Sequence, residues 1–321
     1  MALVLRCILL AFALAVTTPA SAQTWPTRPI HVVIGFPPGG GIDLVARILS
    51  PKLQELLGQP IIVDNRPGAN GIVGMEVVAK APGDGYTFFL GTSGNFCVNP
   101  TFVPNLTFNV DRDFVPVSEV VSTPFLLYVN PSLPAHTLAE FVAYVKAHPG
   151  KVNYSSSGSG GAPHLTTELL NQAAGLKTVH IPYKGSAPAM ADLIGGQVQY
   201  QFDAVAIGLP QVKAGKLRAL ATTGATRLEV LPDVPRANET LPGFVVVNWY
   251  GMVAPAGTSR DIVVRFQQAL ATAMQDPEIR AKLTALATDP VGSTPEALAA
   301  LIRSDTAMWT GVIKSANIKP E

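Results

Sequence analysis

A glycine-rich segment at residues 35–43 (GFPPGGGID) has the composition of an anion-binding turn between a strand and a helix. Glycines let the backbone turn sharply and leave its N–H groups open to a ligand. The first N–H groups of a helix lack partners within the helix, and the helix dipole favours a carboxylate or phosphate there. Asp43 is the expected N-cap residue. The candidate contacts are Phe36, Pro38, Gly39, Gly40, Gly41 and Asp43. From this segment alone, a plain glycine turn is an equally good interpretation.

A second donor-rich segment lies at residues 155–164 (SSSGSGGAPH), again between a predicted strand and a predicted helix. Hydroxyl and N–H groups concentrate here, and Pro163 suits the first turn of a helix. The candidate contacts are Ser156, Gly158, Ser159, Gly160 and His164. A flexible linker is the alternative, but the segment is short and is flanked by regular structure. A histidine in a first helical turn is more often a structural hydrogen-bonding residue than a ligand contact.

Shorter polar clusters follow other predicted strands. Their candidate contacts are Thr92, Ser93 and Asn95 after one strand, Lys184 and Ala187 after another, and Asp203 at the end of a third. Lys184 can pair with an anion, although a solvated lysine is the commoner outcome. The pair Trp249–Tyr250 fits either a flat wall of a site or an aromatic hinge.

The sequence lacks the signatures of several chemistries. No Gly-Lys-Ser/Thr follows the first glycine-rich segment and the Gly-x-Gly-x-x-Gly spacing is missing, which argues against nucleotide binding. No Gly-x-Ser-x-Gly motif occurs, and the five histidines show no metal-ligand spacing. Cys97 has no neighbouring base in the sequence. We therefore predict no catalytic residue, no metal site and no cofactor.

Short apolar strands alternate with amphipathic helices, which predicts an α/β fold with mainly parallel sheets flanked by helices. In the first series we expect strands at 30–36, 60–63 and 86–91 and helices at 42–57 and 71–80. In the second series we expect strands at 125–129, 152–155, 179–182, 198–203 and 217–222 and helices at 138–148, 163–174, 187–195 and 207–214. A loop at 232–243, a strand at 245–254 and helices at 260–274, 277–287 and 295–315 complete the prediction.

Two lobes follow from this order, because about 300 residues are many for one core. The C-terminal helices have few strands of their own, so they are expected to return to the first sheet. We predict a first lobe at residues 23–123 and 249–321, a second lobe at 124–248, and crossings near residues 123 and 248. Ligand sites of open α/β sheets lie beyond the carboxyl ends of strands, so the two lobes would enclose a ligand cleft.

Residues 1–22 have the pattern of a cleavable signal peptide, with one basic residue, an apolar run and a small-x-small end. We expect cleavage between Ala22 and Gln23 and a soluble protein in the periplasm. Removing Arg6 from the 23 basic residues leaves 22 against 22 acidic ones. A formally neutral chain has no basic field for nucleic acid or anionic membranes, so any anion must be bound by local donors. Cys97 would be the single cysteine left, which excludes a disulfide framework.

Seven motifs, in this order, resemble the Bug-type (Bordetella uptake gene) proteins, the extracytoplasmic substrate-binding subunits of tripartite tricarboxylate transporters. They are WPTRPI at 25–30, FPPGGG at 36–41, VDNRPGA at 63–69, PGDGYT at 82–87, HIPYKG at 180–185, AGKLRA at 214–219 and APAGT at 254–258. Each motif alone is modest, but the ordered set is specific and covers essentially the whole mature chain.

The resemblance implies a two-lobed periplasmic binding protein fold of type II that closes on a carboxylated small molecule. It implies that backbone groups and ordered waters at the first glycine-rich loop hold one carboxylate. By position it carries over residues 36–41, Asp43, Thr92, Ser93, Ser156, Gly158, Gly160, His164, Lys184, Ala187 and Asp203. Two departures, Asn95-Phe96-Cys97 after the third strand and Gly161-Ala162-Pro163-His164 in the second lobe, touch the expected ligand walls. They bear on which acid is bound.

The resulting prediction is a non-enzymatic, monomeric binding protein that captures a small carboxylate for the permease subunits of such a transporter. A mono-, di- or tricarboxylate is expected; an aromatic acid is an alternative because Phe36, Phe96 and Trp249 offer apolar walls. Two other functions stay open. One is a ligand-sensing partner of a membrane sensor kinase. The other is a periplasmic hydrolase that uses a cleft serine with His164.

Overall fold

The computed structural model describes residues 25–315. The predicted signal peptide and its cleavage site lie outside the described residues. Within residues 25–315, no helix is both long enough and apolar enough to cross a membrane.

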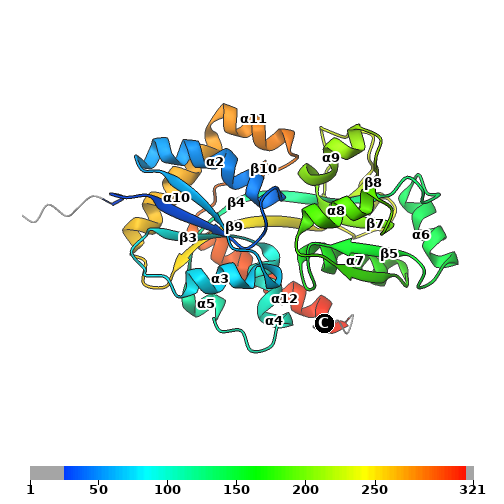
Figure 1. Ribbon diagram of the computed structural model, residues 1–321, viewed down its shortest axis with the longest axis horizontal. Helices are drawn as coiled ribbons and strands as arrows, with labels where there is room; N and C mark the ends of the chain where they lie inside the picture. Colours follow the sequence, from blue (N-terminus) through cyan, green and yellow to red (C-terminus); the bar gives the residue numbers. More distant parts are fainter. Residues whose placement is uncertain (1–24, 316–321) are drawn as a thin grey trace, which may run out of the picture.

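The first lobe is built on three parallel strands in the order β2-β1-β3. These strands are β1 (Ile30–Ile34), β2 (Ile61–Asn65) and β3 (Thr87–Thr92). The helices of this lobe include α2 (Gly41–Leu57), α3 (Ile72–Ala79), α10 (Arg260–Gln275), α11 (Pro277–Ala285) and α12 (Pro295–Ser315). Helix α10 packs on α2, so the C-terminal helices return to the first lobe as predicted (Figure 1).

The second lobe repeats this plan with β7-β5-β6 in parallel. Its strands are β5 (Asn153–Ser156), β6 (Val179–Pro182), β7 (Tyr200–Ala204) and β8 (Arg218–Thr222). Its helices are α6 (Leu138–Ala147), α7 (Ala162–Ala174), α8 (Ser186–Ile194) and α9 (Val205–Lys213). Strand–helix alternation in the sequence therefore predicted both lobes correctly.

Two long strands join the lobes, β4 (Phe114–Val129) and β9 (Val247–Pro255). Strand β4 pairs antiparallel with β9 from Phe114 to Pro124, and then with β7 and β8 from Phe125 to Val129. Figure 1 shows both strands running side by side between the lobes. The result is one ten-stranded mixed sheet, which also includes β10 (Asp289–Pro290). The exact division of the chain at residues 123 and 249 stays a prediction, because β4 belongs to both lobes.

The segment between β3 and β4 holds three short helices that the sequence did not predict. They are a π-helix at Gly94–Val98, α4 (Asn99–Phe102) and α5 (Val110–Asp113). Two single-turn 3-10 helices, Ala69–Gly71 and Ala237–Glu239, are also new. The first of these and the π-helix lie beside the cleft, so they matter for the site.

Helix α2 shows how the sequence fixes the position of a site element. Its apolar residues recur at three- and four-residue spacing, and Ile42, Val45, Leu49 and Leu53 are buried. Gly58 ends the helix in the left-handed conformation with φ of 75°. Because Leu49 is only 2% exposed, Leu49→Ala should cost about 2–5 kcal/mol. Burial of this face holds the N-terminus of α2 at the cleft.

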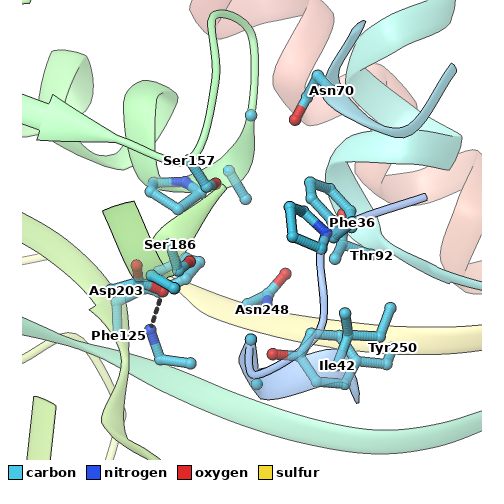
Figure 2. A pocket seen from close by; sticks show the side chains of 18 residues that line it. Phe36, Ile42, Asn70, Thr92, Phe125, Ser157, Ser186, Asp203, Asn248 and Tyr250 are labelled. Atoms are coloured by element: carbon cyan, nitrogen blue, oxygen red, sulfur yellow. Dashed lines mark hydrogen bonds between the residues drawn. The ribbon is translucent and has the colours of Figure 1, made fainter. Parts of the chain in front are cut away.

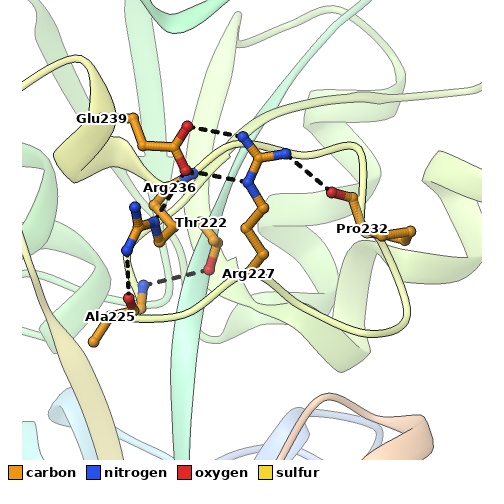
Figure 3. Close-up of polar contacts among 7 residues, drawn as sticks. Thr222, Ala225, Arg227, Pro232, Arg236 and Glu239 are labelled. Atoms are coloured by element: carbon orange, nitrogen blue, oxygen red, sulfur yellow. Dashed lines mark hydrogen bonds and ion pairs between the residues drawn. The ribbon is translucent and has the colours of Figure 1, made fainter.

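The loop-rich segment after β8 is tied together by polar contacts (Figure 3). Glu239 accepts hydrogen bonds from the guanidinium groups of Arg227 and Arg236. Arg227 also donates to the carbonyl of Pro232, and Arg236 donates to that of Ala225. These groups are partly exposed, so solvent weakens each contact, but together they define one conformation for the loop.

Candidate ligand-binding site

A pocket lies between the two lobes and is the strongest candidate for a site (Figure 2). The empty space inside it, including the solvent at its open mouth, is about 590 Å³. We call it the deep pocket. The predicted contacts that line it are Phe36, Gly40, Gly41, Thr92, Ala187 and Asp203. Both lobes contribute, so a ligand in this pocket would touch both.

Four helices, α2, α7, α8 and α9, begin at the deep pocket. Their N-cap residues are Gly40, Gly161, Gly185 and Ala204, and none of the four caps its helix with a side-chain hydrogen bond. The first-turn N–H groups of these helices are therefore not taken up by an N-cap side chain. Four positive helix ends that converge on one small space favour an anion.

Among residues 25–315, no lysine, arginine or histidine lines the deep pocket, and the one carboxylic acid in its lining is Asp203. An anion held there would interact with backbone N–H groups and neutral side chains. This agrees with the expectation, drawn from the neutral charge balance, that local oriented donors bind the ligand.

Two polar side chains from β9 point toward the middle of the deep pocket, those of Asn248 and Tyr250 (Figure 2). The hydroxyl of Ser93 donates to Oδ1 of Asn248 at 2.9 Å, which holds the amide group in place. Burial, followed by the nearby Asp203, raises the pKa of Tyr250, so its phenol stays protonated and can donate. Neither residue was among the predicted contacts, although Trp249–Tyr250 was noted as a wall or hinge.

Asp43 supports the glycine-rich loop from behind and does not line the deep pocket. Its carboxylate accepts hydrogen bonds from Gly39 N at 3.0 Å, Arg47 Nε at 2.9 Å and Asn65 Nδ2 at 3.1 Å. Burial alone would raise the pKa of Asp43, but the hydrogen bonds from Arg47, Gly39 and Asn65 outweigh it and lower the pKa. The N-cap prediction is wrong: Gly40 occupies that position and Asp43 lies in the first turn.

Asn95 has a similar supporting role in the segment after β3. Its side-chain oxygen accepts from the N–H of Thr92 at 2.9 Å, and its NH₂ group donates to the carbonyl of Asn70 at 2.7 Å. Thr92 and Asn70 both line the deep pocket, whereas Asn95 and Ser93 do not. Asn70 has a positive φ of 51°. Asn70 is not among the candidate contacts predicted from the sequence, because the tight turn at this residue was not recognised.

Ser156 and His164 lie beneath the second donor-rich loop. Ser156 Oγ lies 2.7 Å from Nε2 of His180, and Nδ1 of His164 accepts from Gly160 N at 2.9 Å. The two imidazole rings stack with centroids 3.9 Å apart. Burial, with His180 adding to it, lowers the pKa of His164 to about 3, so the ring is neutral. Because Ser156 is fully buried and its neighbour is His180, this geometry does not favour a hydrolase that pairs a cleft serine with His164.

A wider outer groove continues from the deep pocket and shares Phe36, Pro37, Asn70 and Ser157 with it. The predicted contacts Gly158, Ser159 and Lys184 line this groove, which includes apolar residues such as Phe102 and Val103. Lys184 directly precedes Gly185, the N-cap of α8, but it lines the outer groove and not the deep pocket.

The predicted contacts divide between residues that line the two cavities and residues that lie behind them. Pro38, Gly39, Asp43, Ser93, Asn95, Ser156, Gly160 and His164 line neither the deep pocket nor the outer groove. Residues missed by the prediction are Ile42, Asn70, Phe125, Ser157, Gly161, Ala162, Pro163, Ser186, Ala204, Asn248 and Tyr250. Phe96 and Trp249, offered as apolar walls, stack on each other with centroids 5.8 Å apart, and both are buried in the core. Of the three proposed aromatic walls, only Phe36 lies in the site.

The lobes approach each other closely at several glycines. A Cβ atom at Gly185 would lie 3.0 Å from Cδ of Pro37, and one at Gly94 would lie 3.2 Å from the backbone N of Ala162. A Cβ at Gly41 would lie 3.4 Å from Cβ of Ala204 in the second lobe and 2.8 Å from the hydroxyl of Tyr250 within its own lobe. Each larger side chain would have to displace a neighbour, so glycine permits this close form of the cleft.

Comparison with known proteins gives consistent results over most of the chain. A family model described as "Tripartite tricarboxylate transporter family receptor" matches residues 45–318. Protein BugT of Bordetella pertussis is 37% identical over 306 residues, which cover 95% of this chain and 94% of BugT. A protein of R. palustris solved with adipate has a TM-score of 0.90 and 34% identity, covering 92% of this chain and 100% of that chain. MatC from Rhodopseudomonas palustris, solved with bound malate, has a TM-score of 0.85 and 34% identity, covering 90% of this chain and 100% of MatC.

Proposed function

Because this chain belongs to the tripartite tricarboxylate transporter receptor family, which includes the Bug proteins, we propose that it captures a small carboxylate in the periplasm and delivers it to membrane permease subunits. The family consists of solute-binding receptors. Adipate and malate in the two solved relatives support an organic acid as the ligand class. The ligand of this chain is proposed to be a mono-, di- or tricarboxylate.

The convergence of four helix N-termini on a pocket without cationic side chains carries this proposal. A carboxylate is small and planar and can accept several N–H hydrogen bonds at once. A neutral solute would leave those donors unpaired, and a cation would be repelled by the positive helix ends.

A thermal-shift screen tests the ligand class directly. Organic acids of two to eight carbons should be compared with the primary amides of the same acids. A ligand at 100 times its dissociation constant should add about 2.7 kcal/mol to the free energy of unfolding. We expect acids to raise the melting temperature and their amides to leave it unchanged. Equal stabilisation by acids and amides, or by neither, would contradict the proposal.

The proposal that this protein delivers its ligand to a permease needs a cellular experiment. Uptake of a labelled acid that the purified protein binds should require both this receptor and the cognate permease. A ligand-sensing role with a membrane sensor kinase is the alternative partner, and it predicts a transcriptional response with unchanged uptake when the receptor is deleted. Incubation with an ester panel should show no turnover, because the proposal includes no chemical step.

A further inference from the structure

Asp203 is an acidic side chain in a pocket whose helix N-termini favour an anion, so its presence there calls for an explanation. It ends β7, every residue of which is buried, and its own side chain is 3% exposed. Figure 2 shows it on the second-lobe wall beside Ser186 and opposite Tyr250 and Ile42 of the first lobe. A small acid that fills this pocket lies close to the carboxyl group of Asp203.

The hydrogen bonds of Asp203 show how its carboxyl group is used. It accepts from Gln201 Nε2, from Ala204 N at 2.7 Å and from the hydroxyl of Ser186. These three donors favour the ionised form, although burial is the larger effect and raises the pKa of Asp203 to about 6. At neutral pH the group is therefore mainly ionised. A carboxylate has about four acceptor positions, so about one remains for a group in the pocket.

The charges around Asp203 restrict what that group can be. In the part of the chain that the structure describes, no lysine, arginine or histidine lines the deep pocket, so a second carboxylate next to Asp203 would be repelled without compensation. A hydrogen-bond donor on the ligand would instead pair with the free acceptor position. The helix N-termini across the pocket would hold the ligand's own carboxylate.

We infer that Asp203 selects organic acids with a hydroxyl or ammonium group close to the bound carboxylate, as in 2-hydroxy and 2-amino acids. This inference rests on the proposed function and narrows its ligand class. Asp203 accepts a hydrogen bond from the substituent, while N–H groups at the N-terminus of α2, across the pocket, bind the carboxylate.

Calorimetry on the wild-type protein with matched diacids tests the inference. Succinate, malate and aspartate differ only in the substituent, and glutarate, 2-hydroxyglutarate and glutamate repeat the comparison with one more carbon. A hydrogen bond to a charged group should make the substituted acids bind about tenfold or more tighter than the unsubstituted ones. The comparison of malate with aspartate distinguishes the hydroxyl from the ammonium group.

The variant Asp203→Asn should reduce this preference, because it replaces the charged acceptor of the substituent's hydrogen bond with a neutral amide oxygen. We expect the ratio of the dissociation constants of succinate and malate to fall toward one. Asp233→Asn, an exposed change of the same charge in the same lobe, is the matched control and should keep the wild-type ratio. A purely structural role of Asp203 predicts equal weakening for both ligands and an unchanged ratio, which would overturn the inference.

The two proposals fail in different ways. If unsubstituted acids bind the wild-type protein as tightly as their 2-substituted counterparts, the inference about Asp203 is wrong while the carboxylate receptor stands. If no acid of the panel, with adipate, citrate and benzoate added, binds at all, the proposed function itself is wrong. Because the first measurement uses the wild-type protein, it does not depend on the folding of Asp203→Asn.

Discussion

Gly40 offers the sharpest single-residue test of anion binding at the N-terminus of α2. Its φ of −79° suits any residue, and a Cβ there would meet only the carbonyl of Pro37, at 3.8 Å. Gly40→Val should therefore fold, while its branched side chain blocks approach to the first-turn N–H groups. We expect the ligand-free melting temperature to change by only about 2–4 °C and the shift caused by a bound acid to disappear. Gly311→Val, in an exposed helical position with open space around it, is the control. Normal binding by Gly40→Val would refute the assignment.

The buried His164 should make the protein sensitive to acid. Its pKa is lowered to about 3 in the folded protein, against about 6.5 when unfolded. Below pH 6.5 the unfolded chain takes up a proton that the folded chain does not, so stability falls as the pH falls. At pH 4 this one group should cost about 3 kcal/mol relative to pH 7.5. In His164→Gln, which can still accept from Gly160, that loss should be absent. Urea unfolding of both proteins at the two pH values measures it; a stability difference that does not change with pH would contradict this account.

At the scale of elements, ligand binding by helix N-termini predicts that the affinity for an acid depends only weakly on salt concentration. Backbone dipoles in a buried pocket are screened less than exposed charges, and no cationic side chain lines the deep pocket. The dissociation constant of a tightly bound acid should change less than about threefold between about 20 and 200 mM salt. Lys184→Met should leave this dependence unchanged, since Lys184 lies in the outer groove. A steep loss of affinity with salt would point to exposed cations as the main binding groups.

The elements that the sequence predicted are those with a strong local pattern. Helix α2 has apolar residues at helical spacing, and β1 and β3 consist mostly of apolar residues. The first eleven residues of β4 were missed, because Pro116, Glu119 and Pro124 interrupt the apolar pattern while pairing with β9 still orders the strand. A strand that is held by its partner cannot be recognised from its own residues alone.

Sequence pattern does not choose among the residues of a loop, for a related physical reason. Sequence position identifies the loop that follows a strand, but it does not tell which side chains face the cleft and which face the core. Asp43 and Asn95 lie in the correct loops and brace them through hydrogen bonds, whereas Asn248 and Tyr250 reach the pocket from β9. Their contribution depends on how β9 crosses between the lobes, which is a property of the whole fold.

At the scale of the molecule, the close contacts at glycines predict that the described form is the closed one and that the free protein opens. Gly94 tests this, because a Cβ there would press on the backbone of Ala162 in the other lobe. Gly94→Val should hold the lobes apart and weaken binding, with the control Gly311→Val behaving as wild type. Small-angle scattering should show a smaller radius of gyration for the wild type at ligand saturation and no decrease for Gly94→Val. An unchanged radius for the wild type would rule out closure.

The absence of cationic side chains from the deep pocket also has a kinetic consequence. With a formal net charge of +1, the chain has little long-range field to draw an anion in, so association should proceed at an unassisted rate. High affinity must then come from slow dissociation, as the lobes must part before the acid can leave. Such a receptor would release its ligand slowly on its own. Rapid release at the membrane would then require the permease to bind the receptor and separate its lobes.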